Sequence, residues 1–162
     1  VIMKKKVFIA SLICSLLVPT INLAMAQDAS KFVFFHLGEK KDGSLDLNPN
    51  KRSFSIKKEE SYCWMTTIPA EKLTQKTVQL TEKITTPKAG SFSVNNGQTV
   101  KHNKDKTQWT ITHNIPTADL KEQNGLYMGC WIPSNSDPVG EFSLEISTGN
   151  TTFPAVKFAL TE

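Results

Sequence analysis

Cys63 and Cys130 are the residues whose chemistry is easiest to infer, because each lies in a Cys-Trp dipeptide within an apolar segment. Tyr62-Cys63-Trp64-Met65 is echoed later by Gly129-Cys130-Trp131-Ile132. The two cysteines do not form a Cys-x-x-Cys pair, so redox catalysis has little support. In an exported chain, two cysteines are most simply one structural disulfide. We therefore predict a Cys63–Cys130 disulfide between strands distant in the sequence.

Motifs for catalysis and metal binding are absent from the sequence. It contains no Gly-x-Ser-x-Gly, no His-Glu-x-x-His and no phosphate-binding glycine loop. His36, His102 and His113 are isolated from one another, and no two acidic residues stand out as an acid–base pair. We predict no catalytic residue, no metal site and no cofactor. An enzyme whose site assembles from distant residues stays open as a third alternative.

The aromatic residues beside the cysteines are the candidate binding residues. Neighbouring side chains on a strand point to opposite faces, so a cysteine that points inward turns the adjacent Trp outward. Trp and Tyr are the residue types that dominate binding hot spots. The alternative is that loops or a short helix cover these aromatic side chains, which would then be structural. The candidate binding residues are Tyr62, Trp64, Tyr127 and Trp131.

Residues 1–26 have the pattern of a secretory signal peptide, and residues 27–162 are expected to form one domain. The apolar run is shorter than the roughly 20 residues that a membrane-spanning helix needs. We expect cleavage before Gln27, and no membrane span after that cleavage. The pattern consists of a basic region, an apolar run and a small-residue cleavage site: Lys4–Lys6, Val7–Val18 and Ala24–Ala26.

The signal peptide also changes the charge and the cysteine count. A competing interpretation makes Cys14 a lipidation site, but Ile13 stands where such a site needs Gly or Ala. The whole chain has 19 basic and 15 acidic side chains, and three of the lysines lie in the signal. The remaining net charge of +1 gives no support to a nucleic-acid or anionic-membrane partner. A Lys-rich signal of this kind is typical of bacteria, and indicates a periplasmic or secreted protein.

Short alternating segments spaced about ten residues apart predict an all-β domain, either an antiparallel sandwich or a barrel. Asn95-Asn96-Gly97 and Gly149-Asn150 are expected to form hairpin turns. Gly38–Asn50 is expected to be a long loop, and Thr117 to cap a helical turn that ends at Gln123. The expected strands are Lys31–Leu37, Arg52–Lys57, Tyr62–Thr67, Thr77–Thr85, Ser91–Val94, Gln98–His102, Thr107–His113, Gly125–Pro133, Gly140–Ser147 and Phe153–Leu160.

The disulfide pattern, with Tyr127 shortly before the second cysteine, resembles the immunoglobulin-like β-sandwich. The ending Asp137–Ile146, in which Pro and Gly precede alternating apolar residues, is also similar to hairpins of bacterial immunoglobulin-like modules. The resemblance implies a single antiparallel immunoglobulin-like sandwich with one inter-strand disulfide, without indicating a specific family. Tyr127 precedes Cys130 by three residues rather than two, and the Trp expected a dozen residues after Cys63 is missing.

Two functions are predicted from this combination. The first is an exported, non-enzymatic binding or accessory module that recognises an envelope protein, an assembly or a host surface. The alternative is a small periplasmic inhibitor of an envelope or host hydrolase, with the loop Pro133–Val139 presented to the active site. Both imply a protein partner, and the sequence does not define the oligomeric state.

Overall fold

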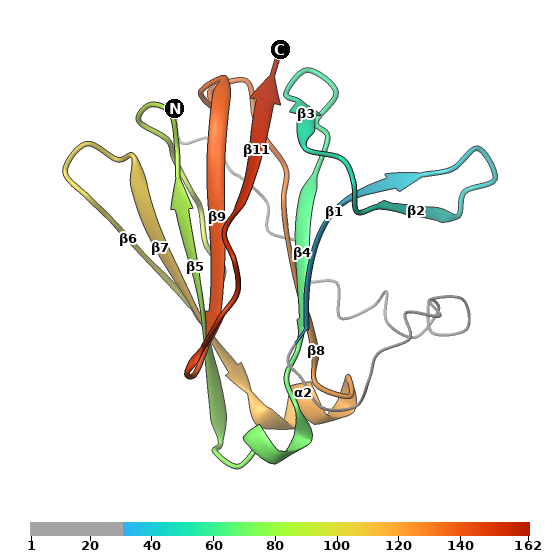
Figure 1. The fold of residues 1–162 in the computed structure, drawn as a ribbon, viewed down its shortest axis with the longest axis vertical. Helices are drawn as coiled ribbons and strands as arrows, with labels where there is room; N and C mark the ends of the chain where they lie inside the picture. The colour runs from blue at the N-terminus through green and yellow to red at the C-terminus, as the bar shows by residue number, and fades with distance from the viewer. Residues whose placement is uncertain (1–30) are drawn as a thin grey trace.

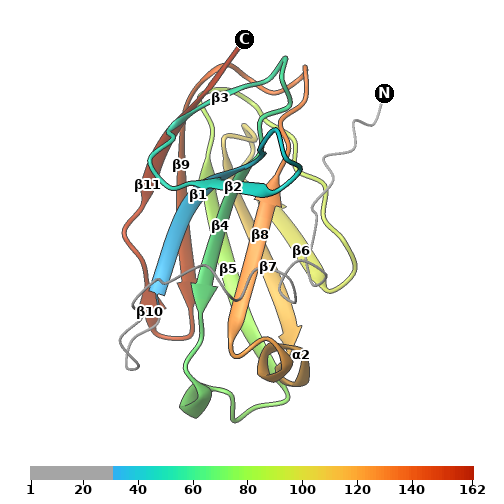
Figure 2. The same cartoon turned by 90° about the vertical axis from the view of Figure 1, so that its right-hand side faces the viewer.

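A computed structural model describes residues 31–162. Two β-sheets pack face to face as a sandwich, as Figures 1 and 2 show from two directions. The predicted signal peptide and its cleavage site lie outside the described residues. Within the described residues, no helix has the length and apolar character needed to cross a membrane. The prediction of an all-β sandwich is confirmed.

The smaller sheet has four strands in the order β2-β1-β4-β8, and all its neighbouring pairs are antiparallel. Strand β1, whose two faces are both apolar, lies between β2 and β4. The strand bounds are β1 (Lys31–Glu39), β2 (Leu45–Asn48), β4 (Tyr62–Thr67) and β8 (Leu126–Trp131).

The larger sheet has the order β3-β11-β9-β5-β7-β6, and β10 pairs with β9. The pair β11–β3 is parallel, so the prediction of a purely antiparallel sandwich is wrong. The chain reaches β3 by crossing over from the smaller sheet, and side-chain alternation does not indicate strand direction. The strand bounds are β3 (Ser53–Ser55), β5 (Thr77–Thr85), β6 (Gln98–His102), β7 (Gln108–Pro116), β9 (Gly140–Thr148), β10 (Thr151–Thr152) and β11 (Val156–Thr161).

The main core lies between the two sheets and follows the two-residue period of the long strands. On β5, Leu80 and Ile84 are buried, and the position between them on the same face is Glu82. On β7, Ile111 and His113 are buried on one face in the same way. Two ionisable side chains therefore occupy core positions on neighbouring strands.

Two segments differ from the sequence-based expectations for strands. Gly38–Asn50, expected to be a loop, contains β2, which pairs with the end of β1. Its two half-buried leucines were too few to give a clear alternating pattern. Ser91–Val94 is not a strand, and Gln98–His102 pairs with β7 instead. Phe92 is nevertheless buried, because its ring packs against Trp131 from an irregular segment.

The helical segments are short. The predicted helical turn is α2 (Thr117–Glu122), and a 3-10 helix, η1 (Ala70–Lys72), follows β4. Thr117 does not cap α2, since its hydroxyl donates to the backbone carbonyl of Gln75 and Pro116 occupies the N-cap position. This bond ties the start of α2 to the segment that leads into β5.

Candidate functional site

The predicted disulfide joins Cys63 of β4 to Cys130 of β8. The two residues are directly opposite each other and their Cα atoms are 4.1 Å apart, so the bond connects adjacent strands of one sheet. An immunoglobulin disulfide instead crosses between two sheets. The bond lies on the outer face of the smaller sheet, in an apolar cluster with Phe35 and Met65.

The tryptophans point away from the cysteines, as alternation requires, but the prediction that they face outward is wrong. Trp64 and Trp131 are 0% and 1% exposed, and they lie with Tyr62 in the core between the sheets. Both faces of β4 and β8 are apolar, so periodicity alone could not identify the interior one. The larger sheet covers the face with the aromatic rings, which have more apolar area to bury.

Two indole N–H groups converge on a buried carboxylate. Oε1 of Glu82 accepts from Nε1 of Trp64 at 2.6 Å and from Nε1 of Trp131 at 2.9 Å. Oε2 of Glu82 lies 2.6 Å from Nε2 of His113. Glu82 is 1% exposed, and its burial is tolerated because three N–H donors replace water. The tryptophans belong to the smaller sheet and Glu82 to the larger one, so the carboxylate links the two sheets.

The bond from Trp64 depends on the residue opposite it. Trp64 pairs with Gly129 across β4 and β8, and both positions face the core. A Cβ atom at Gly129 would lie 2.7 Å from the indole ring, closer than atoms of this kind approach. The glycine therefore leaves the space that the Trp64 ring occupies beside Glu82.

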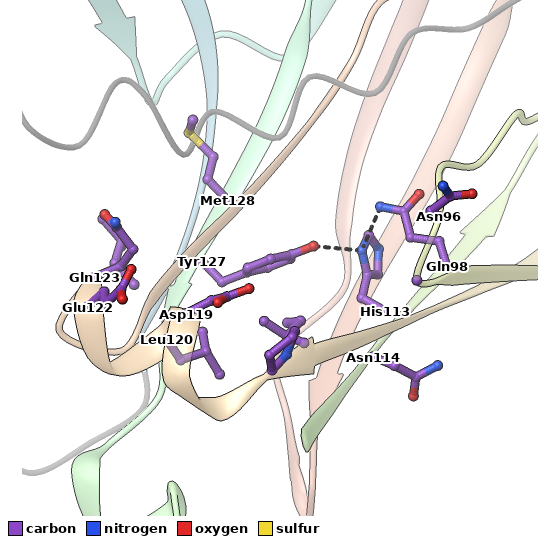
Figure 3. A pocket seen from close by; sticks show the side chains of 14 residues that line it. Asn96, Gln98, His113, Asn114, Asp119, Leu120, Glu122, Gln123, Tyr127 and Met128 are labelled. Carbon is purple, nitrogen blue, oxygen red and sulfur yellow. Dashed lines mark hydrogen bonds between the residues drawn. The ribbon is translucent and has the colours of Figure 1, made fainter. Parts of the chain in front are cut away.

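The hydrogen bonds of Gln98 define the tautomer of His113. Oε1 of Gln98 accepts from the backbone N–H of Asn95 at 2.9 Å, so Nε2 of Gln98 donates to Nδ1 of His113 at 3.1 Å. Nδ1 is then an acceptor, and the imidazole proton is on Nε2, which donates to Glu82. The hydroxyl of Tyr127 also lies 3.0 Å from Nδ1, as the dashed line in Figure 3 shows. A hydrogen-bonded chain thus extends from Glu82 through His113 to Tyr127.

The hydrogen-bonded chain from Glu82 to Tyr127 ends in a groove of about 630 Å³. The groove lies between β8 of one sheet and β6 and β7 of the other, with α2 at one end (Figure 3). Tyr127 and Met128 line it on β8, and Gln98 on the opposite wall. Asp119 and Glu122 of α2 are the lining residues that carry a formal charge. The groove is therefore apolar along β8, mixed along β6 and β7, where Ile115 and Pro116 lie beside polar residues, and acidic at α2.

Tyr127 and His113 are better suited to hydrogen bonding than to covalent chemistry. Burial, together with the charge of Glu82, raises the pKa of Tyr127 to about 12, so the side chain is a neutral phenol at pH 7. Both ring nitrogens of His113 already have partners. A nucleophile needs a lowered pKa or a free base beside it. Residues 31–162 contain no group of three or more His, Cys, Asp or Glu that could hold a metal ion.

Of the four candidate binding residues, the structure brings only Tyr127 to this groove, half-buried at the edge of the sandwich. The others lie in the core behind it. Sequence reasoning did not select Glu82, His113 or Gln98 as site residues. The available signal was an acid and a histidine at core-facing positions of two alternating strands, where polar residues are rarely buried without partners.

Residues 31–161 match the model of a family described as the PM0630 beta sandwich domain. The chain belongs to this family. The match covers nearly all of the described residues, so both sheets and the groove are within the PM0630 beta sandwich domain. No curated protein matches the chain.

A solved structure with a weak similarity is the 35 kDa C-terminal fragment of the major pilin GBS80 of Streptococcus agalactiae. The sequence identity is 13% and the TM-score is 0.36. The similarity covers 82% of this chain and 56% of the pilin fragment, so the chain spans little more than half the length of that fragment. The family match, by contrast, supports the resemblance to β-sandwich modules, without indicating a specific immunoglobulin-like family.

Proposed function

We propose that this chain is an exported, non-enzymatic binding or accessory module that recognises a partner protein through the groove beside β8. The observation that carries the proposal is the position of Tyr127. Its ring lines the groove, and its hydroxyl is held by His113, which is itself held by the buried Glu82. A tyrosine fixed in this way loses little conformational freedom on binding, which is a property of strong hot-spot residues.

The disulfide supports an oxidising compartment, as in an extracellular or cell-surface protein. Together with the predicted signal peptide, it favours the periplasm or the cell exterior as the location. The partner is then an envelope protein, an assembly or a host surface. The nearly neutral charge of residues 27–162 favours a protein partner over a nucleic acid.

Photo-crosslinking from the groove tests this proposal. A photoreactive amino acid replaces Asn96, an exposed residue that lines the groove, and crosslinked proteins are identified after irradiation of intact cells. Binding of the purified partner is then compared for the wild type and for Tyr127→Ala. We expect Tyr127→Ala to lower the affinity about tenfold or more, the loss typical of a hot-spot residue. Lys104→Ala, in an exposed turn, serves as the control. Equal affinity of Tyr127→Ala and the wild type contradicts the proposal.

The inhibitor alternative has support from the loop Pro133–Val139. Oδ2 of Asp137 accepts from the backbone N–H of Ser134 at 2.8 Å, and the N–H of Asp137 donates to the carbonyl of Ser134 at 2.8 Å. The loop is thereby held in one shape, and Val139 at its end is 48% exposed. A rigid loop with an exposed apolar residue suits insertion into an active site. A hydrolase as the crosslinked partner, together with lost inhibition in Val139→Asp, would favour this alternative.

A further inference from the structure

β8 is the least protected of the edge strands in residues 31–162, which are β2, β3, β6, β8 and the two-residue β10. Natural proteins protect such edges from pairing with other chains by making them short or placing charges on them. β3 has three residues, β2 has four and includes Asp46, and β6 includes Lys101. β8 has six residues and no charged side chain.

The backbone of β8 has hydrogen-bonding groups directed away from β4. Opposite residues of an antiparallel pair alternate between a hydrogen-bonded type and a closer non-hydrogen-bonded type. The Cα distance of 4.1 Å assigns Cys63 and Cys130 to the closer type. Met128, two residues before Cys130, is of the same type, so its N–H and C=O point away from β4. Among the strands of residues 31–162, β4 is the sole neighbour of β8.

The side chains along this edge offer two apolar surfaces. Tyr127 lines the groove on the inner side of the strand. Leu126 and Met128 border the groove where the strand runs along it, but they also pack against the outer cluster that contains the disulfide, and all three side chains are half-buried. Side chains of a paired strand alternate in the same way. An extended segment that pairs with β8 would therefore direct alternate side chains beside Tyr127 and beside Met128.

The charge of the groove indicates the sequence of such a segment. Asp119 and Glu122 lie at the α2 end, and no Lys or Arg is among the lining residues. A cationic side chain at one end of a bound segment would complement these carboxylates.

We propose that β8 is a docking edge that receives an extended segment of a partner protein. The segment pairs with the backbone of Met128, alternates apolar side chains along β8, and places a Lys or Arg near Asp119 and Glu122. Strand addition of this kind derives affinity from main-chain bonds and specificity from alternate side chains. This inference rests on the proposed function and specifies its binding mode.

The probe is a set of ten-residue peptides, which are selected from a displayed random library for binding to the purified exported chain. We expect the enriched peptides to alternate apolar residues and to carry a Lys or Arg at one end. Their affinity is then measured for Met128→Pro, which removes the outward N–H but no bond to β4, and for Met128→Val, which keeps it. We expect Met128→Pro to bind about tenfold or more weakly than Met128→Val, which retains both the N–H and an apolar side chain.

If Met128→Pro fails to fold, the pairing can still be tested by changing the peptide instead of the protein. Methylation of backbone nitrogens along an enriched peptide should abolish binding at alternate positions and be tolerated at the positions between them. The double variant Asp119→Asn/Glu122→Gln should remove the preference for Lys or Arg. Enriched peptides without alternation, or methylation effects without a two-residue period, overturn the docking edge.

The failures of the two proposals are distinguishable. If Tyr127→Ala weakens peptide binding but Met128→Pro does not, the groove is still the binding site and pairing with β8 is overturned. Insensitivity to both Tyr127→Ala and Met128→Pro overturns both proposals. Self-association of the chain that Met128→Pro abolishes would identify a second copy as the occupant, and overturns the assignment of the edge to a partner protein.

Discussion

The indole N–H of Trp64 donates to Oε1 of Glu82 at 2.6 Å, so an aromatic side chain of the smaller sheet is anchored on a carboxylate of the larger sheet. Trp131 donates to the same oxygen from the neighbouring strand. Apolar packing between sheets tolerates small displacements, whereas hydrogen bonds to one oxygen atom do not. These bonds therefore define how the two sheets are positioned relative to each other, and with them the groove between β8 and β7.

Glu82→Gln tests this anchor. The amide oxygen can still accept from both indoles, but the new NH2 group then faces the Nε2–H of His113. If the histidine proton moves to Nδ1, it can donate to the hydroxyl of Tyr127, but the NH2 group of Gln98 then loses its acceptor on His113. Either tautomer therefore leaves one polar group of the network without its partner, which costs about 1–3 kcal/mol of the free energy of unfolding. Urea denaturation measures this loss.

Glu141→Gln is the matched control for Glu82→Gln. Glu141 is an exposed β9 residue, and its contact with Lys157 is a surface ion pair at 3.1 Å. Such pairs contribute little, so the free energy of unfolding should change by about 0.5 kcal/mol or less. Equal stability of the Glu82→Gln variant and the wild type would mean that the buried carboxylate does not hold the sheets together.

Gly129→Ala tests the space beneath Trp64. The added methyl group would lie 2.7 Å from the indole, and the ring cannot move away without lengthening its bond to Glu82. We expect a loss of about 1–3 kcal/mol of stability, as for other overpacked cores. In the Trp64→Leu background the same substitution should cost less, because the ring is absent. Thermal unfolding of the four proteins in this double-mutant cycle gives the coupling energy, and additive effects would contradict the contact.

The strand bounds could be predicted where turn residues and alternation agree. Tyr62–Thr67 and Thr77–Thr85 match β4 and β5 at both ends. β3, by contrast, is only three residues long, and its parallel pairing with β11 depends on a crossover between sheets. Local patterns carry information on which residues share a face, and much less on which distant strand will be the neighbour.

Local sequence patterns also could not predict which face of β4 and β8 points to the core. Alternation correctly separated Cys63 from Trp64, but both sets of side chains are apolar and either could have faced the core. The groove was beyond sequence reasoning because its walls come from β6, β7, β8 and α2. His113 and Tyr127 become neighbours only when the sheets pack.

The two tyrosines of the chain provide a pH-dependent test. Burial and the nearby acids Asp137 and Glu82 raise the pKa of Tyr62, while burial and Glu82 raise that of Tyr127 to about 12. A phenol in the unfolded chain titrates near pH 10. Both shifts favour the protonated side chains in the folded state. Their contribution to stability is therefore complete below about pH 10 and is lost as the pH rises through the folded pKa values.

Phenolate absorbance measures these two titrations. The folded protein should show almost none at pH 10, and Tyr127 should ionise first as the pH approaches 12. The chain in concentrated denaturant serves as the reference and should show both ionisations near pH 10. Ionisation of one tyrosine near pH 10 in the folded protein would mean that Tyr127 is not held within the hydrogen-bonded network. Tyr127→Phe assigns that step.

The disulfide gives the last prediction, because it attaches β8 to β4 at the end of the strand that forms the groove wall. Cys63 and Cys130 are 67 positions apart, so reducing the bond releases a long loop in the unfolded chain. The loop-entropy model gives a loss of about 4 kcal/mol, a large share of a typical stability of roughly 5–15 kcal/mol. We expect the double variant Cys63→Ala/Cys130→Ala to melt at a markedly lower temperature than the wild type.

Hydrogen exchange locates the effect of the missing disulfide. Because β8 has one strand neighbour among the described residues, we expect its amides in the double variant to exchange hydrogen faster than those of β5. Two free thiols in the denatured wild-type protein would show that the disulfide does not form. Equal exchange rates of the β8 amides in the wild type and the double variant would show that side-chain packing alone holds this edge.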